Sequence, residues 1–442
     1  MEKTVKRRVP VAALAALVGV LAFVAAGCGG GGGSGGGGGT SSAGGGATKN
    51  PSFHLTIGDL VPLTGDLSVF GPSGRFAANL AVTEAQKALK QAGATNIKVS
   101  IEHADTQTQP QAAVSAARKL VSDGATCLAG AWASADTIPV AQSVSSRQQI
   151  PQISPASTSA QITTLKDNGY LFRTAPSDVL QGKALADVIA QTMGKKTVLS
   201  LAARNDAYGQ GFIDRVKQVW TGMGGKVTSA SPVLYDPNAA SYDSEAQSIV
   251  SGNPGAYVII DFPQTYSKVG AALLRTGKFD ASKMWTADGL ASSTIPQGVP
   301  AAALNGARGT RPGTPASGPA VTAFNKLYQQ QGGPPRASYE PQNFDATMLC
   351  FLAAVAAGSN KGSAIRDQLQ AVSGPPGKKY TFQQLGQAVK ALLQGKQIDY
   401  EGVSGPINFD SNGDPSAATY DVYQYQKGKL KVLKQFAASS GG

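Results

Sequence analysis

The chain is poor in the residues on which most hydrolytic and metal sites depend. Its 442 residues include two histidines and three cysteines. His54 stands at the start of the first predicted strand and His103 lies within a strand, so neither occupies a strand end, where a Ser-His-Asp triad would need it. No GxSxG elbow occurs, and no cysteine or histidine spacing matches a metal site. We therefore expect no enzyme, no resident metal and no cofactor.

Complete nucleotide and calcium motifs are also missing. The stretch YGQGFID, from Tyr208, follows a predicted strand, but Asp214 stands where the dinucleotide fingerprint needs its third glycine. The stretch DSNGD, from Asp410, is followed by Pro415 where an EF-hand loop needs glycine. We expect an ordinary βα turn at Tyr208 and a β-turn between the two final strands at Asp410.

Long apolar runs are absent after the N-terminal region. Four basic residues precede an apolar stretch from Val9 to Ala26, a pattern that predicts a signal peptide over residues 1–27. The stretch AAGC, ending at Cys28, resembles the bacterial lipobox, which implies that Cys28 is lipidated and becomes the mature N-terminus. Plain secretion with an incidental cysteine is the alternative. No later run approaches the roughly 20 residues that span a bilayer.

Glycine is abundant, with 54 residues, but many of them stand in one segment. Residues 28–50 are too glycine-rich to bury a core, and this composition predicts a flexible tether between the lipid anchor and a folded part. We therefore expect an extracytoplasmic protein that is lipid-anchored to the cell membrane.

The formal net charge is +12. The predicted signal peptide holds four basic residues against Glu2, so about +9 remains after its removal. Lysine and arginine are scattered rather than gathered in a stripe with aromatic residues, so we expect no nucleic-acid partner. Cys127 and Cys350 are the cysteines left after Cys28. In an oxidising compartment they could form a disulfide, and two free buried thiols are the alternative.

Strand-like and helix-like stretches alternate from Phe53 onward. Strands are predicted near residues 53–63, 96–105, 126–132, 151–157, 196–204, 256–262 and 283–290. Helices are predicted over residues 74–93, 109–124, 209–225 and 343–358. Alternation over this length predicts an α/β fold with parallel sheets in two lobes. Ligands of such sheets bind beyond the carboxyl ends of the strands.

Small polar or aromatic residues follow most of these strands. Hydroxyl residues there cap helices in the simplest interpretation, but free N–H groups at such turns also hold a carboxylate without a cation. Asp288, in the opposite lobe, could then take an ammonium group. Together these groups predict a clamp for a zwitterion, with Phe70, Trp132 and Phe262 as an aromatic lining.

Five stretches in order resemble one family: GDLVPLTGDLSVFGPSG, SPASTSAQIT, YLFRTAPSDVLQG, NDAYGQG and GPINFDSNGD. The chain resembles the bacterial leucine/isoleucine/valine-binding proteins, the solute-binding components of branched-chain amino-acid ABC importers. The resemblance runs from about Phe53 to the final strand. It implies a class I periplasmic-binding-protein fold, in which two doubly wound α/β lobes are joined by three crossovers. We place lobe 1 at residues 51–174 and 313–404, and lobe 2 at residues 175–312 and 405–442.

The resemblance also implies the ligand contacts of the first lobe. A serine after the GAW-like strand binds the ligand carboxylate, which corresponds to Ser134. Ala156 and Thr158, in the SPAST turn, correspond to residues that bind the α-carboxylate and α-ammonium groups. Phe70 corresponds to an aromatic residue that packs on the ligand and that is Tyr in many relatives. Ser154, Ser157 and Ser159 are left as turn and cap residues.

Contacts of the second lobe follow in the same way. Tyr208 corresponds to a tyrosine that closes over the ligand, and Asp288 to an acid, often Glu in relatives, that pairs with the ammonium group. Phe262 is our choice for a further aromatic contact, with the adjacent Asp261 as the alternative.

The resemblance implies a function in binding and transport, in which no bond is made or broken. A small amino acid or amino-acid-like solute would be captured between the lobes and delivered to the permease and ATPase of an ABC importer. We expect a monomer. The alternative is a ligand-sensing receptor module of the same fold for an amide, urea or another small organic acid.

Overall fold

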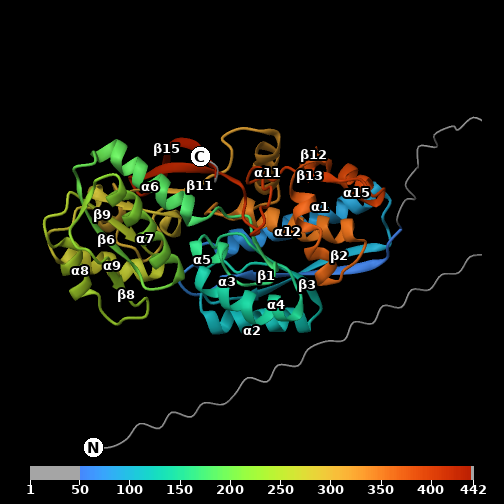
Figure 1. Cartoon of the computed structure of the whole chain (residues 1–442), viewed down its shortest axis with the longest axis horizontal. Coiled ribbons are helices and arrows are strands. Elements are labelled where there is room, and N and C mark those ends of the chain that lie inside the picture. The colour runs from blue at the N-terminus through green and yellow to red at the C-terminus, as the bar shows by residue number, and fades with distance from the viewer. Residues whose placement is uncertain (1–49, 440–442) are drawn as a thin grey trace, which may run out of the picture. The chain divides into compact units, whose positions relative to one another are not determined.

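The computed structural model describes residues 50–439. The predicted signal peptide, the lipidation site at Cys28 and the glycine-rich tether up to residue 49 lie outside the described residues. Within residues 50–439 the chain forms two α/β lobes, each built around its own large sheet (Figure 1).

The sheet of the first lobe is parallel, with strand order β2-β1-β3-β4-β5. Its strands are β1 Phe53–Val61, β2 Ile97–Asp105, β3 Ala125–Ala129, β4 Gln152–Ser154 and β5 Leu171–Arg173. Successive side chains of a strand point to opposite faces. Cys127 therefore packs among α1, α12 and α15, whereas Leu128 packs on the other face against α2 and α3. Helices therefore cover both faces of the sheet, as in a doubly wound lobe.

The helices of the first lobe come from two parts of the chain, as Figure 1 shows in blue to cyan and in orange. The early ones are α1 Gly71–Ala92, α2 Pro110–Ser122, α3 Ser134–Val140, α4 Ser146–Gln148 and α5 Ala160–Thr163. The late ones are α11 Pro319–Gln330, α12 Glu340–Ala357, α13 Gly362–Arg366, α14 Leu369–Ser373 and α15 Leu385–Leu393, with a small parallel pair, β12 Lys378–Tyr380 and β13 Ile398–Tyr400. Helix α12 begins three residues before the predicted start, because Pro341 is tolerated in a first turn.

The two parts of the first lobe are joined by a disulfide between Cys127 and Cys350, with Cα atoms 5.9 Å apart. Cys127 lies on β3, and Cys350 lies in the buried part of helix α12. The bond therefore ties the sheet directly to the helix that returns to it 223 residues later.

The sheet of the second lobe has strand order β15-β14-β11-β10-β9-β6-β7, and β8 pairs with β6. Its strands are β6 Val198–Arg204, β7 Lys226–Val227, β8 Val233–Tyr235, β9 Ala256–Ile260, β10 Met284–Thr286, β11 Arg308–Pro312, β14 Ala417–Gln426 and β15 Lys429–Ser439. Val258 packs on one face against α6 and α7, and Tyr257 packs on the other against α8 and α9. These helices and α10 are α6 Asp178–Met193, α7 Ala207–Gly222, α8 Asp243–Val250, α9 Pro263–Arg275 and α10 Ala301–Leu304.

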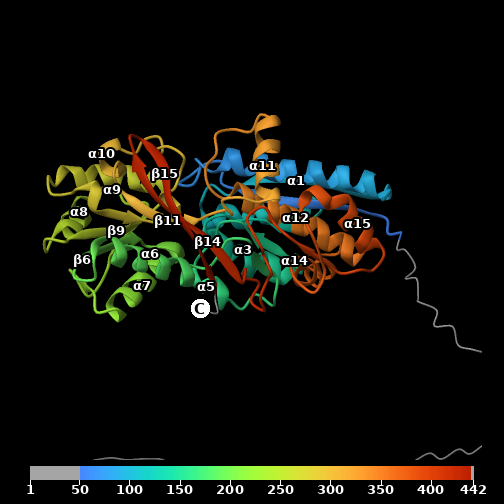
Figure 2. The ribbon, with the colours of Figure 1, turned by 90° about the horizontal axis from the view of Figure 1, so that it is seen from above.

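One edge of the second sheet carries an antiparallel pair of strands in addition to its parallel strands. Strands β14 and β15 are antiparallel to their neighbours and form the hairpin drawn in red in Figures 1 and 2. Lys427 and Gly428 both have positive φ, as a tight two-residue hairpin turn requires. The turn at Asp410 was predicted in the wrong place. It is closed by pairing of Phe409 with Pro415 and precedes β14, so it does not join the two final strands.

The chain crosses between the lobes three times. It passes from β5 to α6, from β11 to α11, and finally into β14. The last crossing lies later than residue 404, because Ile407 and Phe409 still pack in the core of the first lobe. Among the described residues, no helix is both long and apolar enough to span a bilayer.

Candidate functional site

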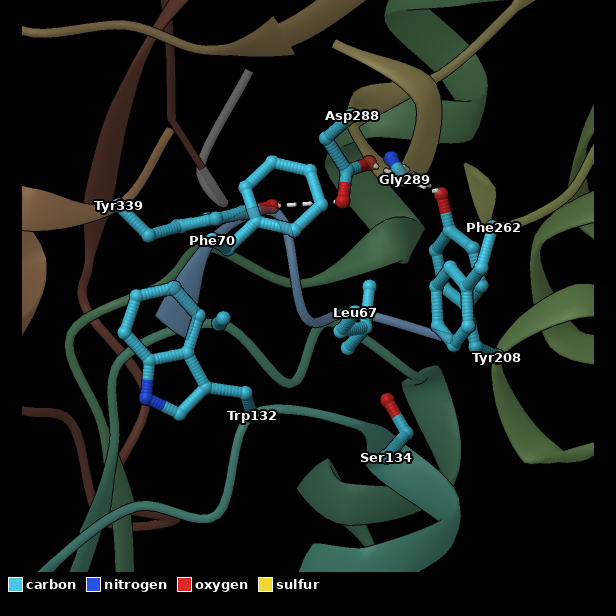
Figure 3. Close-up of a pocket in the computed structure, with 10 residues that line it drawn as sticks. Leu67, Phe70, Trp132, Ser134, Tyr208, Phe262, Asp288, Gly289 and Tyr339 are labelled. Atoms are coloured by element: carbon cyan, nitrogen blue, oxygen red, sulfur yellow. Dashed lines mark hydrogen bonds between the residues drawn. The ribbon is translucent and has the colours of Figure 1, made fainter. Parts of the chain in front are cut away.

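A small cavity lies between the lobes, beyond the carboxyl ends of β3, β4, β6, β9 and β10 (Figure 3). Its volume is about 20 Å³, close to the ~10–15 Å³ that one ordered water molecule needs. The residues that line it are Leu67, Phe70, Trp132, Ser134, Ala156, Tyr208, Phe262, Asp288, Gly289 and Tyr339. Six of the seven predicted ligand contacts are in this set, and Thr158 is the exception.

The first lobe supplies uncharged polar groups. Ser134 opens α3 directly after β3, and Ala156 follows β4. The Ser134 Oγ accepts a hydrogen bond from the Ser159 N–H at 3.3 Å, which leaves its own proton without an acceptor among the described residues. In Figure 3, Ser134 and Asp288 stand on opposite sides of the cavity. A hydroxyl donor and a carboxyl group therefore face the two ends of the same small space.

Three serines around Ala156 hold the turn, and their predicted turn and cap roles are confirmed. Ser154 Oγ donates to Ala131 O at 2.6 Å, and Ser157 Oγ donates to Trp132 O at 2.9 Å. Ser159 caps α5 and donates to Ala207 O in the second lobe at 2.8 Å. These bonds lock β3, β4 and their loops together and leave Ala156 half-buried at the cavity.

Thr158 does not line the cavity. Its side chain is fully buried, and its Oγ1 has no hydrogen-bond partner. Its carbonyl accepts a hydrogen bond from the Asp178 N–H at 2.7 Å. The residue is therefore turned toward the start of α6, behind the cavity.

The second lobe supplies two stacked rings. Asp206 caps α7 by accepting hydrogen bonds from the N–H groups of Tyr208 and Gly209, at 3.1 and 3.0 Å. This cap fixes Tyr208, whose ring stacks on Phe262 with centroids 5.1 Å apart and planes 13° apart. The guanidinium carbon of Arg204 lies 3.9 Å from the centroid of Phe262. The helix cap, the stacking and the Arg204 guanidinium together fix the position of the two rings.

Asp288 is buried, and three side chains donate hydrogen bonds to it. Tyr339 donates to Oδ2 at 2.6 Å, and Gln181 and Tyr208 donate to Oδ1 at 2.8 and 3.2 Å. Burial raises the pKa of Asp288 above its usual value, and these donors act in the opposite direction by stabilising the ionised form. A carboxylate with such support is suited to receive a cation in a dry site.

The alternative contact, Asp261, does not line the cavity. It accepts hydrogen bonds from Tyr235 at 2.9 Å and from the Phe262 N–H at 2.7 Å, and it lies 3.7 Å from Arg204. Burial raises its pKa to about 8. Asp261 therefore supports the loop that presents Phe262.

Sequence reasoning missed Leu67, Gly289 and Tyr339. Tyr339 has φ of 72°, an unusual value for a tyrosine, and stands just before α12, far along the chain from Asp288. A Cβ atom at Gly289 would lie 2.5 Å from Asp261 O, so only glycine fits there. Leu67 and Gly289 lie in loops that follow β1 and β10, but neither side chain carries a binding group that would single it out. Tyr339 follows no strand directly, so the strand-end signal does not reach it.

Comparison with known proteins places these observations in one family. A family model described as "Periplasmic binding protein" matches residues 54–429. The chain belongs to the periplasmic binding protein family. The predicted family and the predicted class I fold are thereby confirmed. Members of this family are extracytoplasmic solute-binding proteins.

Individual relatives are distant. The Leu/Ile/Val-binding protein homolog 1 of Brucella melitensis is 25% identical over 376 residues, which cover 84% of this chain and 90% of that protein. The substrate binding protein LivJ of Streptococcus pneumoniae, solved with isoleucine, has a TM-score of 0.69 at 19% identity and covers 88% of this chain and 100% of its own. An ABC transporter solute binding protein from R. palustris, solved with 4-hydroxybenzoate, has a TM-score of 0.67 at 16% identity. The match covers 87% of this chain and 97% of that protein.

In this periplasmic binding protein the lobes also touch beside the cavity. Asp66, from the first lobe, lies 3.0 Å from Arg204 and accepts a hydrogen bond from Thr265 at 2.8 Å. Gln264 donates to Ser68 at 3.1 Å. These contacts, with the bond from Tyr339 to Asp288, join the lobes in a closed arrangement.

Proposed function

We propose that this protein captures a small amino acid as a zwitterion between its lobes and delivers it to an ABC importer. The observation that carries the proposal is the charge pattern of the cavity. Among the described lining residues, Asp288 is the one charged side chain, and none is Lys, Arg or His. A buried charge needs a partner, and the ammonium group of an amino acid would supply it.

The opposite end of the cavity suits the carboxylate. Ser134 has a hydroxyl proton to donate, and the loop at Ala156 brings backbone groups to the same side. A carboxylate held by neutral donors needs no protein cation. The two ends then match the two charges of a zwitterion, and the rings of Phe70, Trp132, Tyr208, Phe262 and Tyr339 enclose the side chain.

An aromatic acid is the second candidate, because solved neighbours bind 4-hydroxybenzoate and benzoate. The five aromatic rings of the lining favour it. However, such an acid would add a second negative charge near Asp288 and would bring no cation. We therefore place the amino acid first.

Solute size and lobe closure are coupled. The cavity has room for about one ordered water molecule, so the side chains or the lobes must shift to admit an amino acid. Both lobes line the cavity, and contacts with both favour the closed form. Valine, as the smallest solute in the name of the Leu/Ile/Val-binding relatives, is the first to test.

We further propose that residues 1–27 are a signal peptide, that Cys28 carries a lipid anchor and that residues 28–50 tether the lobes to the membrane. The protein acts as a monomer with a permease and an ATPase, without chemistry of its own. The alternative is a sensor that uses the same cavity and reports the solute to a membrane receptor. Finding permease and ATPase genes next to the gene for this chain would favour transport over sensing.

A thermal-shift screen of the purified protein tests the solute class. A solute at 100 times its Kd stabilises the folded state by about 2.7 kcal/mol. We expect shifts with small apolar amino acids and none with benzoate or 4-hydroxybenzoate. A shift with the benzoates alone would contradict the amino-acid proposal and support the aromatic acid.

A further inference from the structure

A second acid lies buried behind Asp288. Asp178, the first residue of α6, is fully buried, and neither of its carboxyl oxygens has a hydrogen-bond partner. It does not line the cavity. None of the ligand contacts described above explains why an acid without a partner is buried here.

Gln181 bonds to Asp288 and stands one helical turn from Asp178. It lies three residues after Asp178 on the same helix, and positions with this spacing share a helix face. Its Nε2 donates to Asp288 at 2.8 Å and to Thr310 O at 3.0 Å, whereas its Oε1 has no partner. Burial raises the pKa of Asp178 well above its usual value, and the negative charge of Asp288 raises it further.

The nearby cation is already occupied. Arg173, on β5, donates to both oxygens of Asp414, at 2.6 and 2.7 Å, and to the carbonyls of Ser157 and Ser159. The other titratable neighbours are phenols: Tyr208, Tyr339 and, on β14, Tyr420. Burial raises the pKa of each of them, so they remain neutral. No described cation therefore bonds to Asp178 or Asp288.

The two acids have different surroundings. Asp288 accepts hydrogen bonds from three side chains, which support its ionised form. Beside Asp178 the Thr158 hydroxyl is the one side-chain donor that lowers the pKa, and its geometry falls short of a hydrogen bond. The N-terminus of α6 favours a negative charge at Asp178, but burying an unpaired carboxylate costs more than this effect returns. A protonated Asp178 carries no charge and has a proton to donate, and the Thr158 hydroxyl beside it is an available acceptor.

We propose that Asp178 is held protonated near neutral pH, so that the acid pair presents a single negative charge, on Asp288, to the solute. The role of this single charge rests on the proposed function, in which the solute carries one ammonium group. One ammonium group then balances the pair, whereas an ionised Asp178 would leave a buried charge without a partner. Asp178 acts through Asp288 and sets the charge to which the cavity is matched, without touching the solute.

The first test follows the stability of the ligand-free protein with pH. A folded-state pKa above the unfolded value gives stability that is present at low pH and is lost as pH rises through the folded pKa. Relative to Asp178→Asn, the folding equilibrium constant of the wild type should fall about tenfold per pH unit from about pH 5 toward the folded pKa. Asp187→Asn, on the exposed face of the same helix, should show a constant offset. An offset independent of pH for Asp178→Asn as well would overturn the proposal.

The second test measures binding of L-valine by calorimetry near pH 7. We expect Asp178→Asn, which copies the neutral acid, to shift the Kd less than about threefold, and Asp288→Asn to weaken it about a hundredfold. Equal losses in both variants would show that Asp178 is ionised and would overturn the proposal. If Asp178→Asn does not fold, Asp178→Ala replaces it in both tests. If L-valine and the other amino acids fail to bind the wild type, the proposed function fails, and the pH test still decides the protonation of Asp178.

Discussion

The two sides of the cavity differ in the kind of group that they offer. The first lobe presents a hydroxyl at Ser134 and a backbone turn at Ala156, both held by hydrogen bonds from neighbouring loops. The second lobe presents one carboxyl group, Asp288, and two stacked rings. Asp288 also takes a donor from across the cavity, because Tyr339 belongs to the first lobe.

This difference separates two tasks. The neutral side holds the carboxylate of a solute by hydrogen bonds from uncharged donors, so it needs no protein cation. The acidic side selects the charge and responds to closure, because the Tyr339 bond to Asp288 exists when the lobes are together. Removing one neutral donor of the first side should therefore weaken binding modestly, and removing the charge of the second side should weaken it strongly.

The largest expected effect concerns the stability of the first lobe. Replacing Cys127 and Cys350 together by Ser should lower the free energy of unfolding by about 3–5 kcal/mol, because the bond restrains a long loop of the unfolded chain. Chemical denaturation measures this loss. The Kd for L-valine should stay near the wild-type value, since neither cysteine lines the cavity. A loss of affinity as large as that of Asp288→Asn would show that the disulfide supports the binding site as well as the stability of the lobe.

The next effect concerns the charge of the second side. Asp288→Asn should weaken L-valine binding by roughly 2–4 kcal/mol, because the ammonium group loses its charged partner in a buried site. Calorimetry measures the change, and Asp280→Asn, near the protein surface on a neighbouring loop, is the matched control. An unchanged Kd would remove Asp288 from the site.

A smaller effect is expected at Ser134. Ser134→Ala removes one neutral donor and should weaken L-valine binding by about 1 kcal/mol. The loss should be the same for every amino acid that binds, because the carboxylate is common to all of them. A loss confined to one side chain would contradict the role of Ser134 and would place the carboxylate elsewhere.

The smallest effect concerns the bond across the cavity. Tyr339→Phe removes one donor from Asp288, so the pKa of that carboxyl should rise further. Binding needs the ionised form, and the affinity should therefore begin to fall at a higher pH than in the wild type as the pH is lowered. A titration of Kd between about pH 5 and about pH 8 measures the shift. Tyr328→Phe, whose hydroxyl bonds to Pro334 O away from the cavity, should leave the profile in place.

The sequence predicts those site residues whose position depends on a local signal. Ser134, Ala156, Tyr208 and Asp288 each follow a strand, and parallel strands end at one edge of a sheet. The two-lobe fold follows from the same alternation of strands and helices. A turn between two final strands was predicted, but it was placed at Asp410 instead of at Lys427 and Gly428.

Residues whose role depends on partners far along the chain could not be predicted from the sequence. Tyr339 meets Asp288 across 51 residues of chain and through a backbone conformation that tyrosine rarely adopts. Asp178 and Gln181 lie on a helix face, where the sequence alone indicates an ordinary amphipathic surface. Thr158 was predicted in the cavity because its turn is there, but the turn directs its side chain to α6.

The central claim is that the cavity recognises both charges of a zwitterion. Calorimetry should compare L-valine with isovalerate, which lacks the amine, and with isobutylamine, which lacks the carboxylate. Each analogue should bind about a hundredfold or more weakly than L-valine, because each leaves one end of the cavity without its partner. Binding of isovalerate as tight as that of L-valine would contradict the claim.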